Sequence, residues 1–200
     1  MIPYEVGFGE VVASTLTSWT VQSWQLGVYP AFGTLVEIDC ENAQSIGIII
    51  DIQTHPKDSA RTPFAFGKTL EELHHEQPHI FHLLQTTLFC VPLAVYAKPL
   101  FVYEIPKKPV SIHSFARSCP VSTIKVFFSE SAWMMSFFNL LRNTPLFDEL
   151  LLAIIRYGYE AGALTPGHMG DIIDTFSLLT HDNYRTLKIF LQRIELFIQQ

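Results

Sequence analysis

The chain has 200 residues, 48% of them hydrophobic and only 16% charged, and its formal net charge is −6 at pH 7. This length suffices for one or two modest domains. The share of charged residues is well below the roughly 25% of soluble domains. We therefore expect apolar surface that a partner covers. The negative charge argues against a surface that binds duplex DNA, because such surfaces place Lys and Arg against phosphates, so we expect any contact with DNA to be indirect.

Four short β-rich runs follow one another in the first quarter of the chain. Each run is rich in β-branched or aromatic residues and ends near Gly, Pro, Asn or Ser. They cover residues 6–12, 19–22, 34–38 and 46–52. Runs that are this short and this closely spaced predict a small barrel or sandwich.

A short helical insertion is predicted after the fourth run. Thr69 and Glu72 have the spacing of a capping box, in which each side chain bonds a free backbone N–H of a new helix. Pro78 suits the first position of a second helical turn. Runs at residues 88–96 and 100–105 then supply the strands that close the barrel, with Pro92 at an edge or bulge where no ladder hydrogen bond is lost.

Pro106 and Pro109 mark the predicted domain boundary, because proline stops a strand and resists a helix on both sides. The barrel, with its helical insertion near residues 69–85, takes residues 1–106, and an α-helical domain takes residues 110–200. Four apolar stripes at helical spacing follow; they lie in segments 133–141, 150–157, 172–179 and 184–198. The predicted fold class is α+β, a small N-terminal β-barrel followed by a C-terminal helical bundle.

Three segments of the first half resemble the HAS-barrel family, the small barrel at the N-terminus of HerA-type DNA-translocating ATPases and of ATP synthase catalytic-ring subunits. They are Gly9-Glu10-Val11-Val12-Ala13-Ser14-Thr15, Pro30-x-Phe32-Gly33-x-Leu35-Val36-x-Ile38 and Gly47-Ile48-Ile49. The resemblance covers about residues 5–105, and short members that lack the ATPase domain are the most similar, through Arg61-x-Pro63-x-Ala65-x-Gly67. It implies a barrel that serves assembly and not turnover.

Gly67-Lys68-Thr69 matches only the end of a phosphate-binding loop. Such a loop needs an earlier glycine, so that backbone N–H groups can close around the phosphates, and here Thr62 and Pro63 stand in its place. We therefore interpret the segment as a helix cap and expect no nucleotide cofactor.

Four histidines, His74, His75, His79 and His82, cluster at helical spacing, a pattern that can bind zinc. Pro78 interrupts the helix between them, and no nearby cysteine completes a tetrahedral set. We expect solvated or interface histidines and no metal site.

For nucleophilic catalysis the chain offers Ser114, Ser118 and Cys119 near His113. No Gly-x-Ser-x-Gly elbow and no oriented carboxylate accompanies them, so we expect no enzymatic activity. A small hydrolase that uses His113 and Cys119 is the weakest alternative.

The three cysteines, Cys40, Cys90 and Cys119, show no Cys-x-x-Cys spacing, which predicts reduced thiols. The N-terminus lacks the positively charged start and apolar core of an export signal. The apolar run at residues 88–97 is too short to span a bilayer. We expect a cytoplasmic protein that does not contact membranes.

An aromatic cluster in the helical half exceeds what a single buried stripe needs. We expect most of it to be core and the excess to form a docking face, because large aromatic side chains are enriched at interface centres. The predicted interface residues are Phe128, Trp133, Phe137 and Phe138. The sequence thus favours a non-catalytic protein-interaction or assembly module that binds protein partners and also self-associates; an accessory factor that docks on a separate DNA translocase or nuclease is the second alternative.

Overall fold

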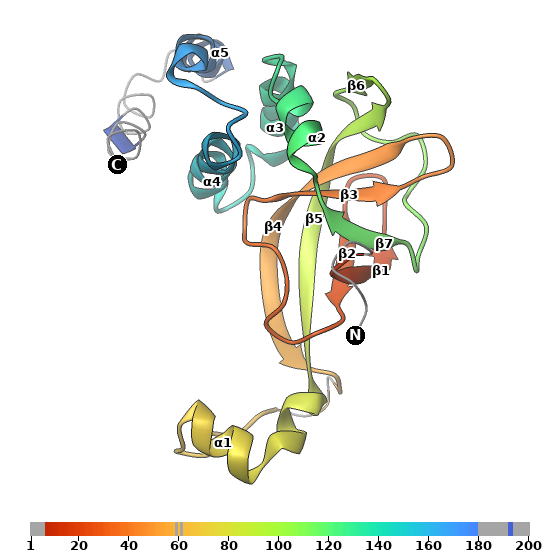
Figure 1. Cartoon of the computed structure of the whole chain (residues 1–200), viewed down its shortest axis with the longest axis vertical. Helices are drawn as coiled ribbons and strands as arrows, with labels where there is room; N and C mark the ends of the chain where they lie inside the picture. Colours follow the sequence, from red (N-terminus) through yellow and green to blue (C-terminus); the bar gives the residue numbers. More distant parts are fainter. Residues whose placement is uncertain (1–6, 59, 61, 180–191, 194–200) are drawn as a thin grey trace.

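The computed structural model describes residues 7–58, 60, 62–179 and 192–193. Seven antiparallel strands form one sheet in the order β2-β1-β7-β3-β4-β5-β6, and an additional pairing of β2 with β5 closes six of them into a barrel (Figure 1). The strands are β1 (Gly9–Ser14), β2 (Trp19–Ser23), β3 (Leu35–Asp39), β4 (Gln44–Pro56), β5 (Leu84–Ala97), β6 (Leu100–Val102) and β7 (Phe115–Ser118). The predicted barrel is confirmed.

Apolar side chains from all six barrel strands fill the inside of the barrel. Side chains alternate between the two faces of a strand, and one face of each strand contributes to this cluster. Its buried members are Phe8, Val11, Trp19, Val21, Val36, Ile38, Ile49, Leu88, Cys90, Val110 and Ala116. The interior is therefore a packed core, as in other small barrels.

Gly47 lets the ring of Trp19 approach the backbone of β4. A Cβ atom on Gly47 would lie 2.5 Å from the Trp19 ring and 2.8 Å from the Val91 carbonyl oxygen. Pro92 lies opposite Gly47, and the register shifts beside this pair, which confirms the predicted bulge at Pro92. The bulge and the glycine together make room for the indole.

Gly47→Ala should destabilise the barrel by about 1–3 kcal/mol, because one methyl group overpacks the contact with Trp19. Urea denaturation followed by tryptophan fluorescence measures this change. Gly170→Ala is the matched control, since nothing lies within 4 Å of a Cβ at that helical position. Equal stability of the two variants would contradict the packing role of Gly47.

Four helices share one core with side chains on the outer face of β3, β4 and β5 (Figure 1). They are α2 (Val121–Phe127), α3 (Ala132–Leu141), α4 (Phe147–Glu160) and α5 (Met169–Leu179), the last preceded by the 3-10 turn η2 (Pro166–His168). The Ser136 hydroxyl on α3 donates a hydrogen bond of 2.6 Å to the Leu93 carbonyl on β5. The α+β class is confirmed. The predicted stripe at residues 184–198 falls outside the described residues except for 192–193, so the bundle stays a prediction.

Strand β7 corrects the predicted boundary at residue 106. It lies between β1 and β3 and pairs Ala116 with both Gly9 and Ile38, so the barrel ends at Ser118. Pro106 and Pro109 interrupt the strand pattern, but the chain then returns to the sheet for four residues. A strand this short carries too little alternation to stand out in the sequence.

Strands β4 and β5 extend beyond the barrel as a two-stranded arm (Figure 1). They have 13 and 14 residues, whereas the other barrel strands have four to six. Their pairing continues to Pro56 and Leu84, well past the last partners that β3 and β2 provide. We define the arm as residues 53–86 and its tip as residues 57–83.

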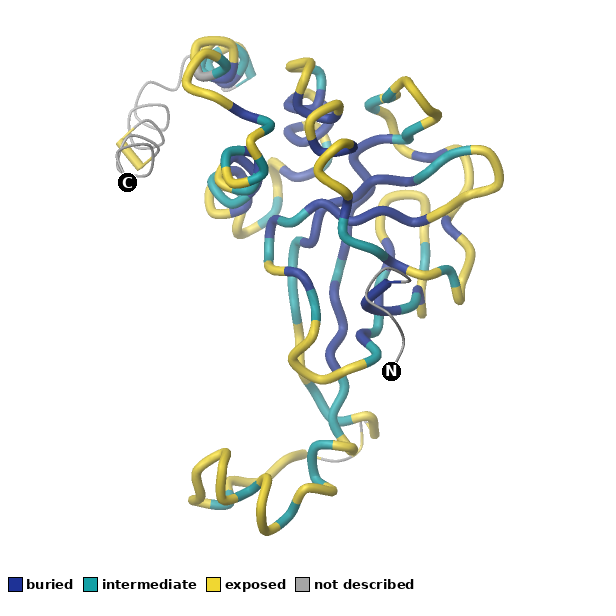
Figure 2. Tube along the Cα trace, in the orientation of Figure 1, coloured by how far each residue is buried: buried dark blue, intermediate teal, exposed yellow. Residues whose placement is uncertain are grey.

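The tip contains the helix α1 (Leu70–Glu76) and the 3-10 helix η1 (Pro78–Leu83), which confirms the predicted insertion. The capping box is present: the Thr69 hydroxyl accepts the Glu72 backbone N–H at 3.2 Å, and the Glu72 carboxylate accepts the Thr69 N–H at 2.7 Å. Neither helical element contains a buried residue. Figure 2 shows the change from a buried barrel to an exposed tip along the arm.

Candidate interaction surface

The four predicted interface residues lie in the core, and that prediction is wrong. Phe128, Trp133, Phe137 and Phe138 are each at most 5% exposed. Six of the ten residues of α3 are buried, because this helix packs on β5 and on α5 at the same time. These four aromatic residues are therefore core residues of a helix that is covered on two sides.

These aromatic rings contact one another mostly edge to face. Phe127 and Phe128 lie 5.1 Å apart between ring centroids, and Phe128 and Trp133 lie 5.2 Å apart. Phe138 lies 5.5 Å from Phe176 on α5. Edge-to-face pairs at this separation stabilise a core beyond the area that they bury.

The Lys68 and Thr69 segment behaves as the helix cap that the sequence predicts. Thr69 caps α1, and the Lys68 amine pairs with the Glu76 carboxylate at the other end of the same helix. Both polar groups are thus engaged within the tip.

The histidine cluster is spread along α1 and η1. His74 stacks on Phe81, with ring centroids 3.9 Å apart and planes inclined by 12°. In the described part of the chain, no group of three or more His, Cys, Asp or Glu side chains is placed to hold a metal ion.

His113 and Cys119 lie in different surroundings. His113 is exposed and pairs through Nδ1 with Glu10, whereas Cys119 is buried in the core beneath the helices. Burial raises the pKa of the Cys119 thiol well above its ordinary value, so the thiolate needed for nucleophilic attack is disfavoured.

One ionisable cluster lies on β3 and β7. The Arg117 Nε donates to Glu37 at 3.2 Å, and its terminal nitrogen donates to Asp39 at 2.6 Å. Burial raises the pKa of Glu37 even though Arg117 opposes the shift. Burial also acts to raise the pKa of Asp39, but hydrogen bonds from Arg117 and Gln44 lower it overall. Glu37 is only 5% exposed, so the cluster is a structural ion pair within the wall of the barrel.

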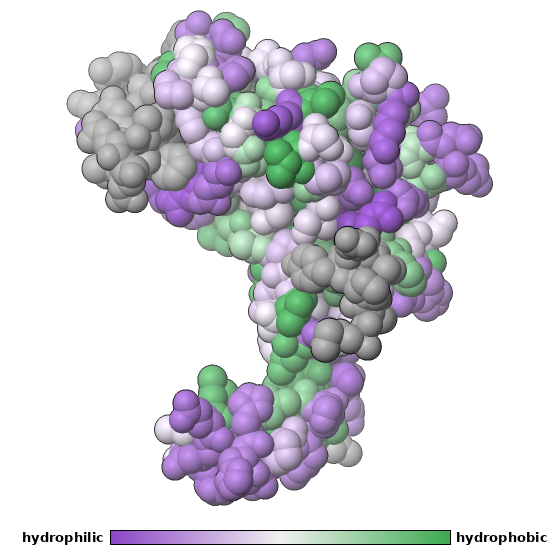
Figure 3. All heavy atoms as spheres, in the orientation of Figure 1, coloured by the Kyte–Doolittle hydropathy of each residue, from purple (hydrophilic) through white to green (hydrophobic). Residues whose placement is uncertain are grey.

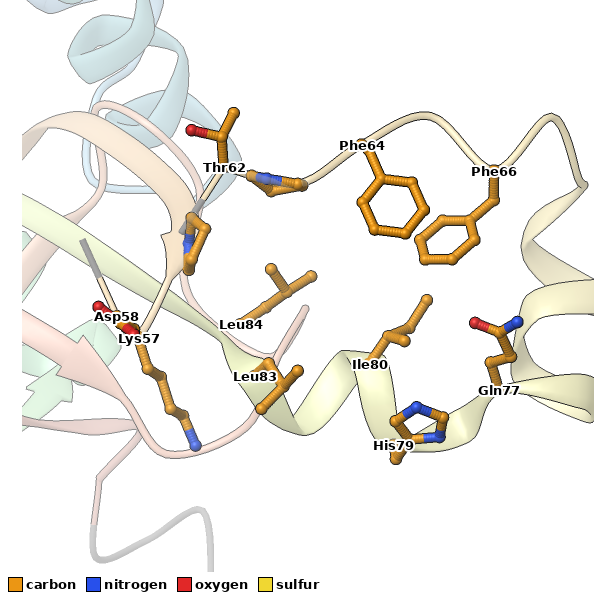
Figure 4. Close-up of a pocket in the computed structure, with 12 residues that line it drawn as sticks. Lys57, Asp58, Thr62, Phe64, Phe66, Gln77, His79, Ile80, Leu83 and Leu84 are labelled. Atoms are coloured by element: carbon orange, nitrogen blue, oxygen red, sulfur yellow. The ribbon is translucent and has the colours of Figure 1, made fainter. Parts of the chain in front are cut away.

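The arm tip carries exposed apolar side chains. Phe64, Leu70 and Leu83 are 73%, 69% and 50% exposed. Phe64 and Leu83 also line a hollow of about 570 Å³, which has Phe64 and Phe66 on one side and Ile80 and Leu84 on the other (Figure 4). The remaining lining residues are Pro56, Lys57, Asp58, Thr62, Pro63, Gln77 and His79. We call this set, together with Leu70, the tip surface.

The tip cannot bury this surface by itself. A helix of seven residues is shorter than the roughly 12–15 residues needed for stability in isolation, and most helices depend on packing of an apolar face. On the side drawn in Figure 3, hydrophobic residues gather on the ribbon just before the tip, and hydrophilic residues cover most of the tip itself. An apolar patch with a polar rim is typical of a protein interaction site.

A second hollow, of about 500 Å³, lies between residues 39–45 and residues 104–111. Its lining mixes both charge signs, with Asp39, Glu41 and Glu104 opposed by Lys107 and Lys108. This mixture gives no consistent preference for a charged ligand, so the tip surface is the stronger candidate.

Comparison with known proteins adds no family assignment: no protein-family model matches the sequence, and no curated protein is significantly similar to it. The resemblance to HAS barrels therefore stays a prediction that rests on the segments quoted above. None of the helices in the described ranges is long and apolar enough to cross a membrane.

Proposed function

We propose that this protein is a non-catalytic interaction and assembly module of the cytoplasm, in which the barrel is the platform and the tip surface is the contact site. The observation that carries the proposal is the apolar surface on a projecting arm whose two helical elements contain no buried residue. Exposed apolar side chains such as Phe64 gain free energy when a partner removes them from water.

The barrel supports the role of a platform. Its interior is filled by side chains, and the helices add a second core on its outer face. The two strands of the arm continue from the wall of the barrel, so the barrel carries the tip. The resemblance to HAS barrels favours the same role, because that family implies assembly.

The double substitution Phe64→Asp and Leu83→Asp should abolish partner binding, because it places two charges in the tip surface. The tagged full chain serves as bait in a lysate of its source cells, with mass spectrometry as the readout. Leu100→Asp is the control, since Leu100 is 70% exposed on β6, away from the arm. We expect a protein that the wild type and the control capture and the double variant does not. Identical capture by all three chains would contradict the proposal.

A further inference from the structure

The hollow between residues 39–45 and residues 104–111 lies at the mouth of the barrel, and we call it the mouth hollow. Ser45 on β4 pairs with Ile38 on β3 and with Val95 on β5. Directly opposite residues on neighbouring strands have their side chains on the same face of a sheet, and Ile38 belongs to the core inside the barrel. The side chain of Ser45 therefore lies on the inner face of the barrel, at the end where the mouth hollow opens.

The hydroxyl of Ser45 is a buried polar group without a partner. Ser45 is 1% exposed, and its Oγ has no hydrogen-bond partner within the described part of the chain. A buried hydroxyl that stays unpaired costs free energy, and most such groups in folded proteins are paired. Because Ser45 also lines the mouth hollow, a molecule bound there can supply that hydrogen bond.

Residues 105–109 form one wall of the mouth hollow. Among the described residues, no backbone group of this segment forms a hydrogen bond with another backbone group, and Pro106 and Pro109 have no N–H to donate. Burial of the Pro106 and Val110 side chains holds the segment in place. The segment can therefore shift to admit a ligand to Ser45 without breaking a backbone hydrogen bond.

The chemistry of the walls indicates the class of ligand. The charged lining residues are exposed and of both signs, so they give an ion no net attraction. Sites for small organic molecules have mostly apolar walls with few polar groups, have volumes of about 300–1,000 Å³, and occur in the mouths of β-barrels. The mouth hollow, of about 500 Å³, has these properties, and its apolar side chains include Val95, Val102, Ile105 and Val110.

We infer that the mouth hollow binds a small, uncharged, largely apolar molecule, and that one polar group of this molecule forms a hydrogen bond with the Ser45 hydroxyl. The mouth hollow and the tip surface lie at opposite ends of β4, since Ser45 lines the first and Pro56 lines the hollow of the second. The inference is therefore independent of the proposed function.

Fluorescence titration of the full chain with N-phenylnaphthylamine tests the inference. This probe is neutral, has a single N–H donor and fluoresces more strongly in apolar surroundings. We expect saturable binding by the wild type. Ser45→Ala should weaken this binding about fivefold, because one hydrogen bond is lost. Val102→Asp should weaken it about tenfold or more, because it places a charge in the apolar wall; Val102 is 45% exposed, so the fold tolerates this substitution.

Leu100→Asp and Phe64→Asp are the controls, and circular dichroism confirms that each variant is folded. Leu100 lies on β6 with Val102 and is 70% exposed, but it does not line the mouth hollow. Phe64 lines the hollow of the tip surface, which an apolar probe could also enter. Both controls should keep a saturable site with the affinity of the wild type. A wild type without saturable binding, binding that Phe64→Asp abolishes, or unchanged binding in Ser45→Ala or Val102→Asp would overturn the inference.

Discussion

Replacing Phe128 and Phe138 together with Asp should unfold the helical layer of this protein. Truncation of a buried Phe costs about 3–5 kcal/mol, and a carboxylate in its place adds the cost of burying an unpaired charge. Both side chains are almost completely buried. The combined loss is comparable to the whole free energy of unfolding of a typical domain, about 5–15 kcal/mol. Thermal unfolding followed by circular dichroism measures the effect.

Phe64→Asp is the control for this experiment, because it makes the same chemical change at a residue that is exposed. Surface substitutions usually alter stability by less than about 0.5 kcal/mol, so the melting temperature of this variant should stay close to that of the wild type. A double variant of Phe128 and Phe138 that stays folded but changes its association state would restore the docking face predicted from the sequence.

The interface prediction failed because helical periodicity reports how many sides of a helix are apolar but not which neighbours cover them. The sequence shows that α3 is apolar nearly all round. An apolar surplus of this kind fits an exposed docking face, and it equally fits a helix covered on two sides. Contacts of Phe138 with Phe176 of α5, about forty residues later in the chain, decide between them.

Local signals, in contrast, predicted local structure well. The capping box at Thr69 and Glu72 and the bulge at Pro92 depend on residues close in sequence or on the chemistry of a single residue. The arm was not foreseen, because polar residues such as Gln53, Thr54 and Gln85 resemble a loop when they are read alone. Their strand conformation depends on the long pairing of β4 with β5. The candidate surface could not be predicted for the same reason, since it lies at the end of that ribbon, away from the barrel.

Arg117→Met should destabilise the barrel by about 3 kcal/mol at neutral pH, because it leaves the buried carboxylate of Glu37 without its partner. The Met side chain fills a similar volume, so the loss reports the charge and not a cavity. Chemical denaturation of the full chain gives the free energy of unfolding. The double variant Glu37→Leu with Arg117→Met removes both charges and should recover most of the loss, since replacing a buried ion pair by apolar groups is often neutral.

The destabilisation by Arg117→Met should depend on pH. Burial raises the pKa of Glu37 above its ordinary value of 4.5, so the native state holds more protons than the unfolded state just above that pH, and this contribution to stability is lost as pH rises through the native pKa. Without Arg117, the pKa of Glu37 should rise further. Arg117→Met should therefore lower the free energy of unfolding less near pH 5 than at neutral pH, because the protonated carboxyl of Glu37 needs no partner.

Asp39 has the opposite effect on the pH dependence of the wild type. Its lowered pKa stabilises the fold above the ordinary value of 3.8, and that contribution is lost as pH falls through the native pKa. A destabilisation by Arg117→Met that is equal at both pH values would show that Glu37 does not depend on Arg117 for its charge.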